Sequence, residues 1–246
     1  MAINLKKTTK KDIASIKGIR LGVTSAGIKD DATDLLVIVL PDNSNVTGLF
    51  TQNQFCAAPV ILSKDHLAHE DNIRALVINS GCANAGMGQQ GMDDAKTVCK
   101  SLATHLDINE RQVLPFSTGL IMSKLPVEKI IKAIPNAIND LNENNWFEAA
   151  ESIMTTDTAP KAYSKIIKLE DIKTVYTHPQ VFAQCSHFLA GLGNIEVKTC
   201  DSTADAMVKV GELSSPNAAA IGSAESGHLY GLKAIKSDLA NQKENH

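Results

Sequence analysis

The segment Ser117-Thr118-Gly119 holds the first residues whose types and spacing could do chemistry. It directly follows Val113–Phe116, a short apolar run that is typical of a strand. A hydroxyl beside an unhindered glycine N–H can point two donors at a developing oxyanion, as acyl transfer requires. Ser, Thr and Gly are also favoured in ordinary turns on backbone grounds. The residues alone leave both interpretations open, and the turn is the simpler one.

Three glycines, Gly86, Gly88 and Gly91, have the spacing GxGxxG between an expected strand and an expected helix. That arrangement can bring a dinucleotide pyrophosphate to the N–H groups of a helix N-terminus. The fingerprint needs its first glycine almost directly after the strand, whereas the six residues 80–85 intervene here. We therefore favour a packed glycine turn over nucleotide binding, and we expect no cofactor.

A third polar run, Met154-Thr155-Thr156-Asp157-Thr158, follows an apolar helical pattern. Its hydroxyls could contact a polar substrate, or they could cap and end the helix. From these residues alone we favour the cap.

Metal and disulfide chemistry find no support in the sequence. The five cysteines are scattered, and the seven histidines show neither HxxxH nor HxH spacing. The cysteines are Cys56, Cys82, Cys99, Cys185 and Cys200. Such a pattern favours reduced, mostly buried thiols and predicts that no metal is bound.

The elements that must position these segments alternate between strands and helices, which predicts an α/β fold. Expected strands cover residues 35–40, 46–50, 74–79, 113–116, 195–200 and 218–221, with the first two forming a hairpin. Expected helices cover residues 95–106, 126–134, 146–154, 179–189, 203–210 and a stretch that reaches Tyr230. The pattern changes character near Leu169, so we expect two domains, 1–168 and 169–246.

Composition excludes several classes of protein. The chain has 246 residues and a net charge of −3, which gives no reason to expect nucleic acid as a partner. Aromatic residues make up 4%, so the core must rely on aliphatic side chains. The longest apolar run, Leu35–Leu40, is far shorter than the ~18 residues of a membrane span. Without a signal-peptide pattern, we expect a cytoplasmic protein that does not enter a membrane.

Residues 18–168 resemble the N-terminal chain of the glutamate/ornithine N-acetyltransferase family of arginine biosynthesis. The matching segments occur in the order and spacing of that family over some 150 residues. They are Gly22-Val23, Ala26-Gly27-Ile28-Lys29, Phe50-Thr51-Gln52-Asn53, Ala57-Ala58-Pro59-Val60, Val77-Ile78-Asn79-Ser80-Gly81, Ala83-Asn84-Ala85, Ser117-Thr118-Gly119 and Met154-Thr155-Thr156-Asp157-Thr158. The resemblance implies mixed α/β layers for this part of the chain.

The resemblance also implies a reaction and roles for three residues. Members of the family cut themselves before a threonine, whose new α-amine can act as the base for its own hydroxyl. Acetyl transfer from N-acetylornithine to glutamate then passes through an acetyl-threonine, without a metal. Thr118 and Gly119 are implied as the oxyanion hole, and Thr155 as a contact of the amino-acid substrate.

The family's self-cleavage segment is absent from this sequence. No lysine-glycine-serine-glycine-methionine segment follows Thr158, and no asparagine-methionine-alanine-threonine cleavage site comes after it. The nucleophilic threonine is therefore absent, and the second chain that carries it would have to be supplied separately. We expect an incomplete enzyme that is inactive alone, with an exposed sheet edge or apolar face through which it could form a homo-oligomer.

The C-terminal 70 or so residues are similar to the second lobe of prephenate dehydratase. The matching segments are Thr177-His178-Pro179-Gln180, Phe182-Ala183-Gln184-Cys185, Ser202-Thr203-Ala204-Asp205-Ala206, Ala218-Ala219-Ala220-Ile221-Gly222-Ser223 and Leu229-Tyr230-Gly231-Leu232. The resemblance implies a small βαβ lobe of periplasmic-binding-protein type. His178, Ser202 and Thr203 are implied as ligand contacts at helix N-termini, although His178 could equally be a helix cap. The enzyme's first lobe and its threonine-arginine-phenylalanine motif are absent.

Three hypotheses follow for the whole chain. The first is the acetyltransferase portion joined to a dehydratase-like lobe. The second is a module of phenylalanine biosynthesis in which that lobe binds a carboxylate or a protein partner. The third is a truncated or engineered fusion without activity.

Overall fold

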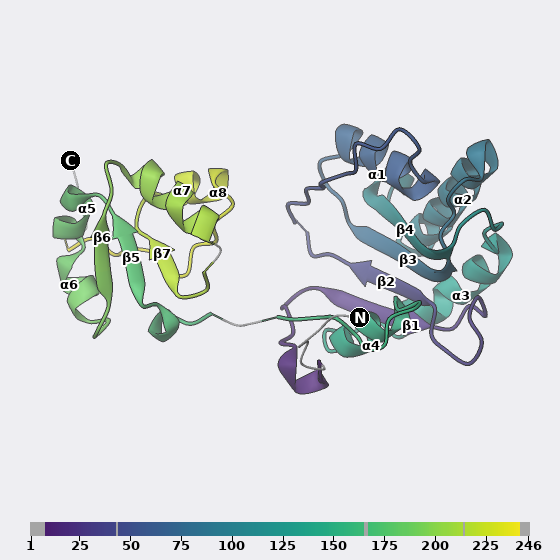
Figure 1. The fold of residues 1–246 in the computed structure, drawn as a ribbon, viewed down its shortest axis with the longest axis horizontal. Coiled ribbons are helices and arrows are strands. Elements are labelled where there is room, and N and C mark those ends of the chain that lie inside the picture. The colour runs from purple at the N-terminus through teal and green to yellow at the C-terminus, as the bar shows by residue number, and fades with distance from the viewer. Residues whose placement is uncertain (1–7, 43, 165–166, 214, 242–246) are drawn as a thin grey trace. The chain divides into compact units, whose positions relative to one another are not determined.

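The computed structural model describes residues 8–42, 44–164, 167–213 and 215–241, and it divides the chain into two compact units. Unit 1 comprises Met1–Lys165 and unit 2 comprises Ile166–His246. Each unit has its own sheet and its own hydrophobic core (Figure 1). Among the described residues, no helix combines the length and the apolar character needed to cross a bilayer.

Unit 1 is built on a four-stranded mixed sheet with the strand order β1-β2-β3-β4. The strands are β1 (Arg20–Thr24), β2 (Leu35–Val39), β3 (Ala75–Cys82) and β4 (Val113–Leu120). The helices are α1 (Ala58–His69), α2 (Gly88–Leu106), α3 (Val127–Asn139) and α4 (Trp146–Ser152), with 3-10 turns η1 (Lys10–Asp12) and η2 (Glu110–Gln112). β1, β2 and β3 are antiparallel neighbours, whereas β3 and β4 are parallel.

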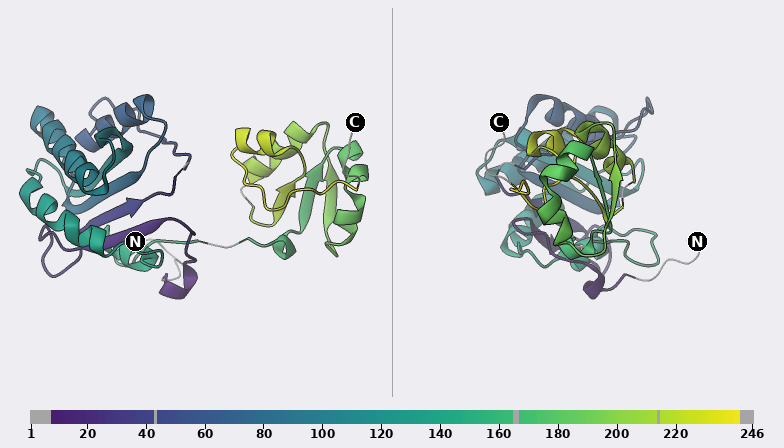
Figure 2. Two further views of the ribbon diagram at one scale, coloured as in Figure 1. Left: turned by 180° about the vertical axis from the view of Figure 1, so that it is seen from behind. Right: turned by 90° about the vertical axis from the view of Figure 1, so that its left-hand side faces the viewer.

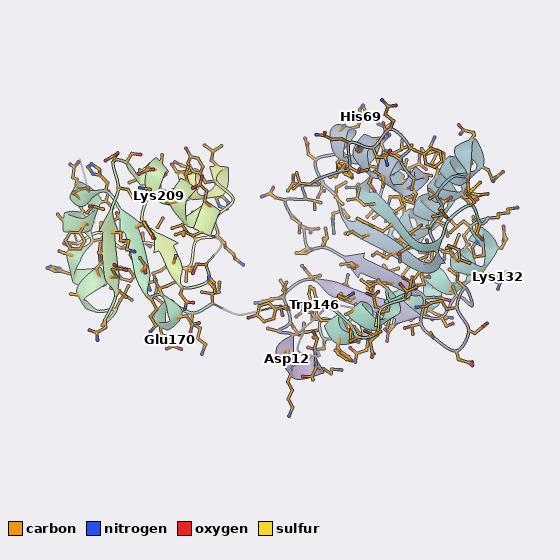
Figure 3. All side chains as sticks on the ribbon, in the orientation of Figure 1. Asp12, His69, Lys132, Trp146, Glu170 and Lys209 are labelled. Atoms are coloured by element: carbon orange, nitrogen blue, oxygen red, sulfur yellow. The ribbon has the colours of Figure 1, made fainter. Side chains whose placement is uncertain are left out.

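The alternation of β2 explains why helices cover both faces of this sheet. Its residues 35, 37 and 39 belong to the main core, which they share with residues of α1, α2 and α3. Its residues 36 and 38 pack on the opposite face, where α4 contributes Ala149 and Trp146 (Figures 1 and 3). Each fully buried aliphatic side chain contributes roughly 1.5–3 kcal/mol, so a strand that is apolar on both faces is stable only between two layers.

Polar groups of neighbouring segments cover part of both sheet edges. On β4, the Ser63 hydroxyl of α1 donates to the Pro115 carbonyl (3.1 Å), and the His66 ring lies 2.7 Å from the Val113 carbonyl. On β1, the backbones of Leu21 and Asn142 exchange two hydrogen bonds. The expected open edge is therefore closed along the first half of β4.

Most expected elements of unit 1 are confirmed, but the hairpin partner at residues 46–50 is wrong. Residues 44–57 contain no strand, and the Leu49 side chain is fully exposed. The physical reason is that both edges of β2 are occupied, one by β1 and the other by β3. β1 and α1 lie outside the set of expected elements.

Unit 2 contains a parallel three-stranded sheet with the order β6-β5-β7 (Figure 1). Its elements are η3 (Leu169–Asp171), β5 (Thr174–Thr177), α5 (Pro179–Gln184), α6 (Ser186–Ala190), β6 (Glu196–Thr199), α7 (Thr203–Leu213), β7 (Ala218–Ala220) and α8 (Ala224–Leu229). The chain steps from β5 to one neighbour and then to the other, so right-handed crossovers place α5 and α6 on one face and α7 on the other. Figure 2 shows the same unit from two further directions.

The single helix expected over residues 179–189 is two short helices, α5 and α6, which meet at Cys185. Asn241 explains the break. Its backbone N–H donates to the Gln184 carbonyl (2.7 Å), and its side-chain amide donates to the Ala183 carbonyl (3.2 Å). Carbonyls that are satisfied by a distant residue no longer require the continued helix.

Candidate functional site

The parallel pair β3 and β4 holds the Thr118-Gly119 segment at the carboxyl ends of both strands. Ser80 is the register partner of Thr118, and Gly81 is that of Gly119. Gly119 has φ +131°, and a Cβ there would lie 2.3 Å from the Gly81 carbonyl carbon. Only glycine tolerates both the backbone conformation and this close approach. The sequence therefore fixes an unusual backbone at the point where an oxyanion donor is expected.

The sequence pattern places Ser117-Thr118-Gly119 in a turn after a strand that ends at Phe116. That placement is wrong, because β4 continues through Leu120. The three residues are part of the ladder, and the register shifts between Gly81 and Cys82 opposite them. A β-bulge of this kind redirects side chains at the end of a strand. Thr118 is half-buried and Gly119 is exposed, so this part of the strand is accessible.

The hydroxyl of Ser117 is already engaged by a buried amide. It donates to Oδ1 of Asn79 at 2.6 Å, and Nδ2 of Asn79 donates to the Cys82 carbonyl at 2.8 Å. Asn79 is only 4% exposed, so its amide joins the two strands around the irregular register. Of the two hydroxyls in this segment, Ser117 supports the backbone. A small cavity is lined by Asn79 and Ser117 together with Phe116 and neighbouring core residues.

Thr155, the expected substrate contact, lies in an exposed turn after α4. The end of α4 is fastened to β3, because the Ser80 hydroxyl donates to the Ser152 carbonyl at 2.5 Å. Ser80 is fully buried, and its register partner is Thr118. The structure therefore joins the Thr155 turn to the Thr118-Gly119 segment through one side chain. Nearby, a hydrogen bond from Lys161 holds the pKa of Asp157 below its ordinary value.

A buried carboxylate and a lysine complete this connection. The fully buried Asp34 accepts backbone N–H bonds from Ala26 (2.6 Å), Ile28 (2.5 Å) and Lys29 (2.9 Å). Nζ of Lys29 donates to the carbonyls of Ser152 (3.1 Å) and Met154 (3.0 Å). Burial lowers the pKa of Lys29, against the opposing attraction of Asp34. In the sequence, Lys29 could be identified only through the motif match at residues 26–29. The carbonyls that its ammonium group binds belong to residues more than a hundred positions away.

The glycine segment serves packing at the start of α2. Gly86 and Gly88 have positive φ, and Gly88 is the first residue of the helix. A Cβ at Gly91 would lie 2.7 Å from Oδ1 of the buried Asn84, whose Nδ2 donates to the Gly91 carbonyl (2.9 Å). These contacts are those of a packed glycine turn.

Four exposed apolar side chains lie next to the Thr118-Gly119 segment. They are Phe55, Leu120, Ile121 and Met122, each at least 69% exposed. A Cβ at Gly86 would contact both Phe55 and Met122, so these two side chains lie on either side of Gly86. We call these four residues the apolar patch. Grouped exposed apolar side chains of this kind are candidates for an interaction surface.

In unit 2, the candidate residues lie at the carboxyl edge of the parallel sheet. His178 directly follows β5, and Ser202 and Thr203 follow β6 at the start of α7. Nδ1 of His178 accepts the Gln180 N–H (3.3 Å), and the Ser202 hydroxyl accepts the Asp205 N–H (3.0 Å). In this structure both side chains therefore cap helices. The Thr177 hydroxyl beside them is buried and has no hydrogen-bond partner among the described residues.

The cysteines are free thiols, and four of the five are buried. Within the described residues, no group of three or more His, Cys, Asp or Glu side chains is arranged to hold a metal ion.

The chain matches two protein families in overlapping regions. Residues 20–178, more than half of the chain, match the ArgJ family. Residues 125–246 match the family described as prephenate dehydratase.

Individual relatives support the first match. The arginine biosynthesis bifunctional protein ArgJ of Colwellia psychrerythraea is 47% identical over 180 residues, covering 69% of this chain and 42% of its own length. That of Neisseria meningitidis serogroup A is 48% identical over 176 residues, covering 71% and 42%. The chain thus spans less than half the length of these curated relatives.

Two solved structures are similar to 63% of this chain. One is ArgJ from Bacillus halodurans, with a TM-score of 0.56, 31% identity and 81% of that chain covered. The other is ornithine acetyltransferase from Mycobacterium tuberculosis complexed with ornithine, with a TM-score of 0.58, 30% identity and 84% covered. The ArgJ family match, the two ArgJ relatives, the mixed α/β fold of unit 1 and the two solved structures agree. The chain belongs to the ArgJ family.

Proposed function

We propose that residues 1–168 form the front portion of a glutamate/ornithine N-acetyltransferase, and that the chain is inactive on its own. In this proposal the Thr118-Gly119 segment stabilises the transition state of acetyl transfer from N-acetylornithine to glutamate. Thr118 and Gly119 donate to the oxyanion, and Thr155 contacts the amino-acid substrate. A separate chain supplies the nucleophilic threonine, which is absent here.

The observation that carries the proposal is the backbone of Gly119. Its φ of +131° and its approach to Gly81 leave no room for a side chain, and it remains exposed beside Thr118. A fixed donor of this kind needs no reorganisation when charge develops, which is the main requirement of an oxyanion hole. The ArgJ match over residues 20–178 includes this segment.

The proposed roles fit both halves of the reaction. In the first half, a threonine hydroxyl of the second chain attacks the acetyl carbonyl carbon and gives its proton to a base. Thr118 and Gly119 hydrogen-bond to the carbonyl oxygen as it becomes an oxyanion. The amide C–N bond then breaks, and the ornithine nitrogen leaves with the proton. In the second half, the glutamate amine attacks the acetyl-threonine ester, and the threonine oxygen regains a proton as the ester bond breaks.

The test supplies the missing chain. We expect a mixture of this chain with the separately produced second chain of the Colwellia relative to exchange acetyl groups between N-acetylornithine and glutamate. Thr118→Ala should lower kcat by roughly 10²–10³-fold, as the loss of one oxyanion donor does in other enzymes. Thr104→Ala, at an exposed position of α2, is the matched control and should leave the rate unchanged. If Thr118→Ala leaves acetyl exchange in the mixture unchanged, the proposed role of Thr118 as an oxyanion donor is wrong. If the isolated chain becomes acylated, the proposal that it is inactive on its own is wrong.

For residues 169–246 we propose a carboxylate-binding lobe of periplasmic-binding-protein type. Three observations support it: the match to prephenate dehydratase, the strand order and the placement of His178, Ser202 and Thr203. The order β6-β5-β7 creates a switch point where the strand order reverses, and ligands of open parallel sheets bind at the carboxyl ends of strands there. All three residues follow strands at that edge.

Calorimetry tests the second proposal. We expect prephenate or phenylalanine to release or absorb heat on binding the full chain, and His178→Ala to weaken that binding. His187→Ala, on α6, serves as the control because His187 lies away from the carboxyl edge of the sheet. If neither compound gives heat, the small-molecule form of this proposal is wrong.

A further inference from the structure

Lys29 occupies the space between the two parts of the proposed acetyl-transfer site. Its side-chain stem lies against β3, since a Cβ at Gly81 would be 3.1 Å from Cγ of Lys29. Its ammonium group reaches the carbonyls of Ser152 and Met154 at the end of α4. Gly81 is the register partner of Gly119, and Met154 is bonded directly to Thr155.

The charge of Lys29 suits this location. The carbonyls at the end of α4 carry the negative pole of the helix and have lost their partners within it. The carboxylate of Asp34 is fully buried and attracts the same ammonium group. Asp34 also accepts the backbone N–H of Lys29 itself, so the lysine backbone is fixed before its side chain reaches α4.

We propose that Lys29 is a positioning residue that holds the Thr155 turn at a fixed separation from the Thr118-Gly119 segment. This inference rests on the proposed function for its consequence in catalysis, but its geometry stands on the chain alone. In this role Lys29 acts through Met154, whose carbonyl it holds, and through Gly81, against which its stem packs.

Three variants separate this role from a merely structural one. Lys29→Met keeps the aliphatic stem against Gly81 and removes the ammonium group, while Ser80 still binds the Ser152 carbonyl. Lys29→Arg keeps the charge and the donors. Lys129→Met is the matched control, because Nζ of Lys129 donates to the Gly27 carbonyl of the same loop (2.7 Å) but does not reach α4.

The first measurement is millisecond amide hydrogen exchange of the full chain, which needs no substrate. The amide of Met154 donates to the Glu151 carbonyl (3.1 Å), so its exchange is protected. We expect Lys29→Met to speed exchange of the Met154 amide about tenfold, the effect of losing a hydrogen bond to a charged group. Exchange of residues 117–120 should not change in Lys29→Met, and exchange of the Met154 amide in Lys29→Arg and Lys129→Met should stay close to that of the parent chain. Unchanged exchange at Met154 in Lys29→Met, or an equal increase throughout unit 1, would overturn the proposal.

The second measurement is the two-chain exchange assay. Because a misplaced Thr155 weakens substrate binding, Lys29→Met should raise KM for N-acetylornithine about tenfold with kcat changed less than about twofold. Lys29→Arg should restore most of the KM. A normal KM for Lys29→Met in an active mixture would overturn the proposal. An inactive parent mixture would instead overturn the proposed function, and hydrogen exchange would still decide the role of Lys29.

Discussion

Cys99 faces the main core from α2 and is 1% exposed. Burial raises the pKa of Cys99 to about 12 from the ordinary 9.0, and the charge of Glu110 adds to the shift. Between these two pH values the folded state keeps the proton that the unfolded state has lost. The free energy of unfolding must then fall as pH rises above 9, by up to about 1.4 kcal/mol per pH unit.

This pH dependence can be measured through Trp146, the only tryptophan of the chain, which packs in unit 1. We expect the urea midpoint of Trp146 fluorescence to fall between pH 8.5 and pH 10.5 more steeply in the parent chain than in Cys99→Ala. The comparison between the two chains removes the contributions of other titrating groups. Equal slopes would contradict a buried, protonated Cys99.

At the scale of single residues, the sequence supplies candidate positions whose roles stay predictions. Thr118, Gly119 and Thr155 were placed by motif, and the structure brings their segments together through Ser80 and Lys29. The roles of Asn79 and Lys29 could not be predicted, because each depends on a partner that is distant in the sequence. His178 caps α5 in this structure, and its role as a ligand contact stays a prediction.

At the scale of elements, the close contact of β3 and β4 depends on Gly119. A methyl group at this position would meet the backbone of Gly81 at 2.3 Å and of Cys82 at 2.6 Å, where neither neighbour can rotate away. We expect Gly119→Ala to destabilise unit 1 by about 2–5 kcal/mol, combining backbone strain with the separation of the strands.

Gly88→Ala is the matched control for this prediction. Gly88 also has a positive φ, +56°, but a Cβ there meets nothing within 4 Å. Its replacement should therefore cost only about 1 kcal/mol. Urea denaturation followed by Trp146 fluorescence measures both variants, and equal losses would show that the strand contact contributes nothing.

Strands and helices with a clean apolar period could be predicted, and those with an interrupted period could not. β2 was evident as a continuous apolar run, and α2 was evident because its buried positions follow a period of 3.6 residues. α1 was missed because Ser63 and His66 occupy its buried face, where they bind carbonyls of β4. The false strand at 46–50 has the composition of a strand, but the sheet has no free edge of β2 to pair with it.

At the scale of the whole molecule, the core clusters of the two units draw on separate stretches of the chain. The change in pattern near Leu169 predicts domains 1–168 and 169–246, and the contacts of the structure divide the chain between Lys165 and Ile166. The sequence could predict an apolar surface only through the resemblance. The structure shows four exposed apolar side chains, the apolar patch, beside Thr118 and Gly119.

The apolar patch predicts self-association of the chain, because grouped exposed apolar side chains on a soluble domain mark interaction sites. We expect light scattering after size exclusion to give a mass that rises with concentration. Ile121→Lys should lower that mass by placing a charge in the patch, whereas Ile61→Lys, at an exposed position of α1, should not. Adding the second chain of the Colwellia relative should replace self-association by a complex that contains both chains, if both associations bury the same four side chains. A monomer at every concentration, or equal effects of the two lysine substitutions, would show that the patch is not an interface.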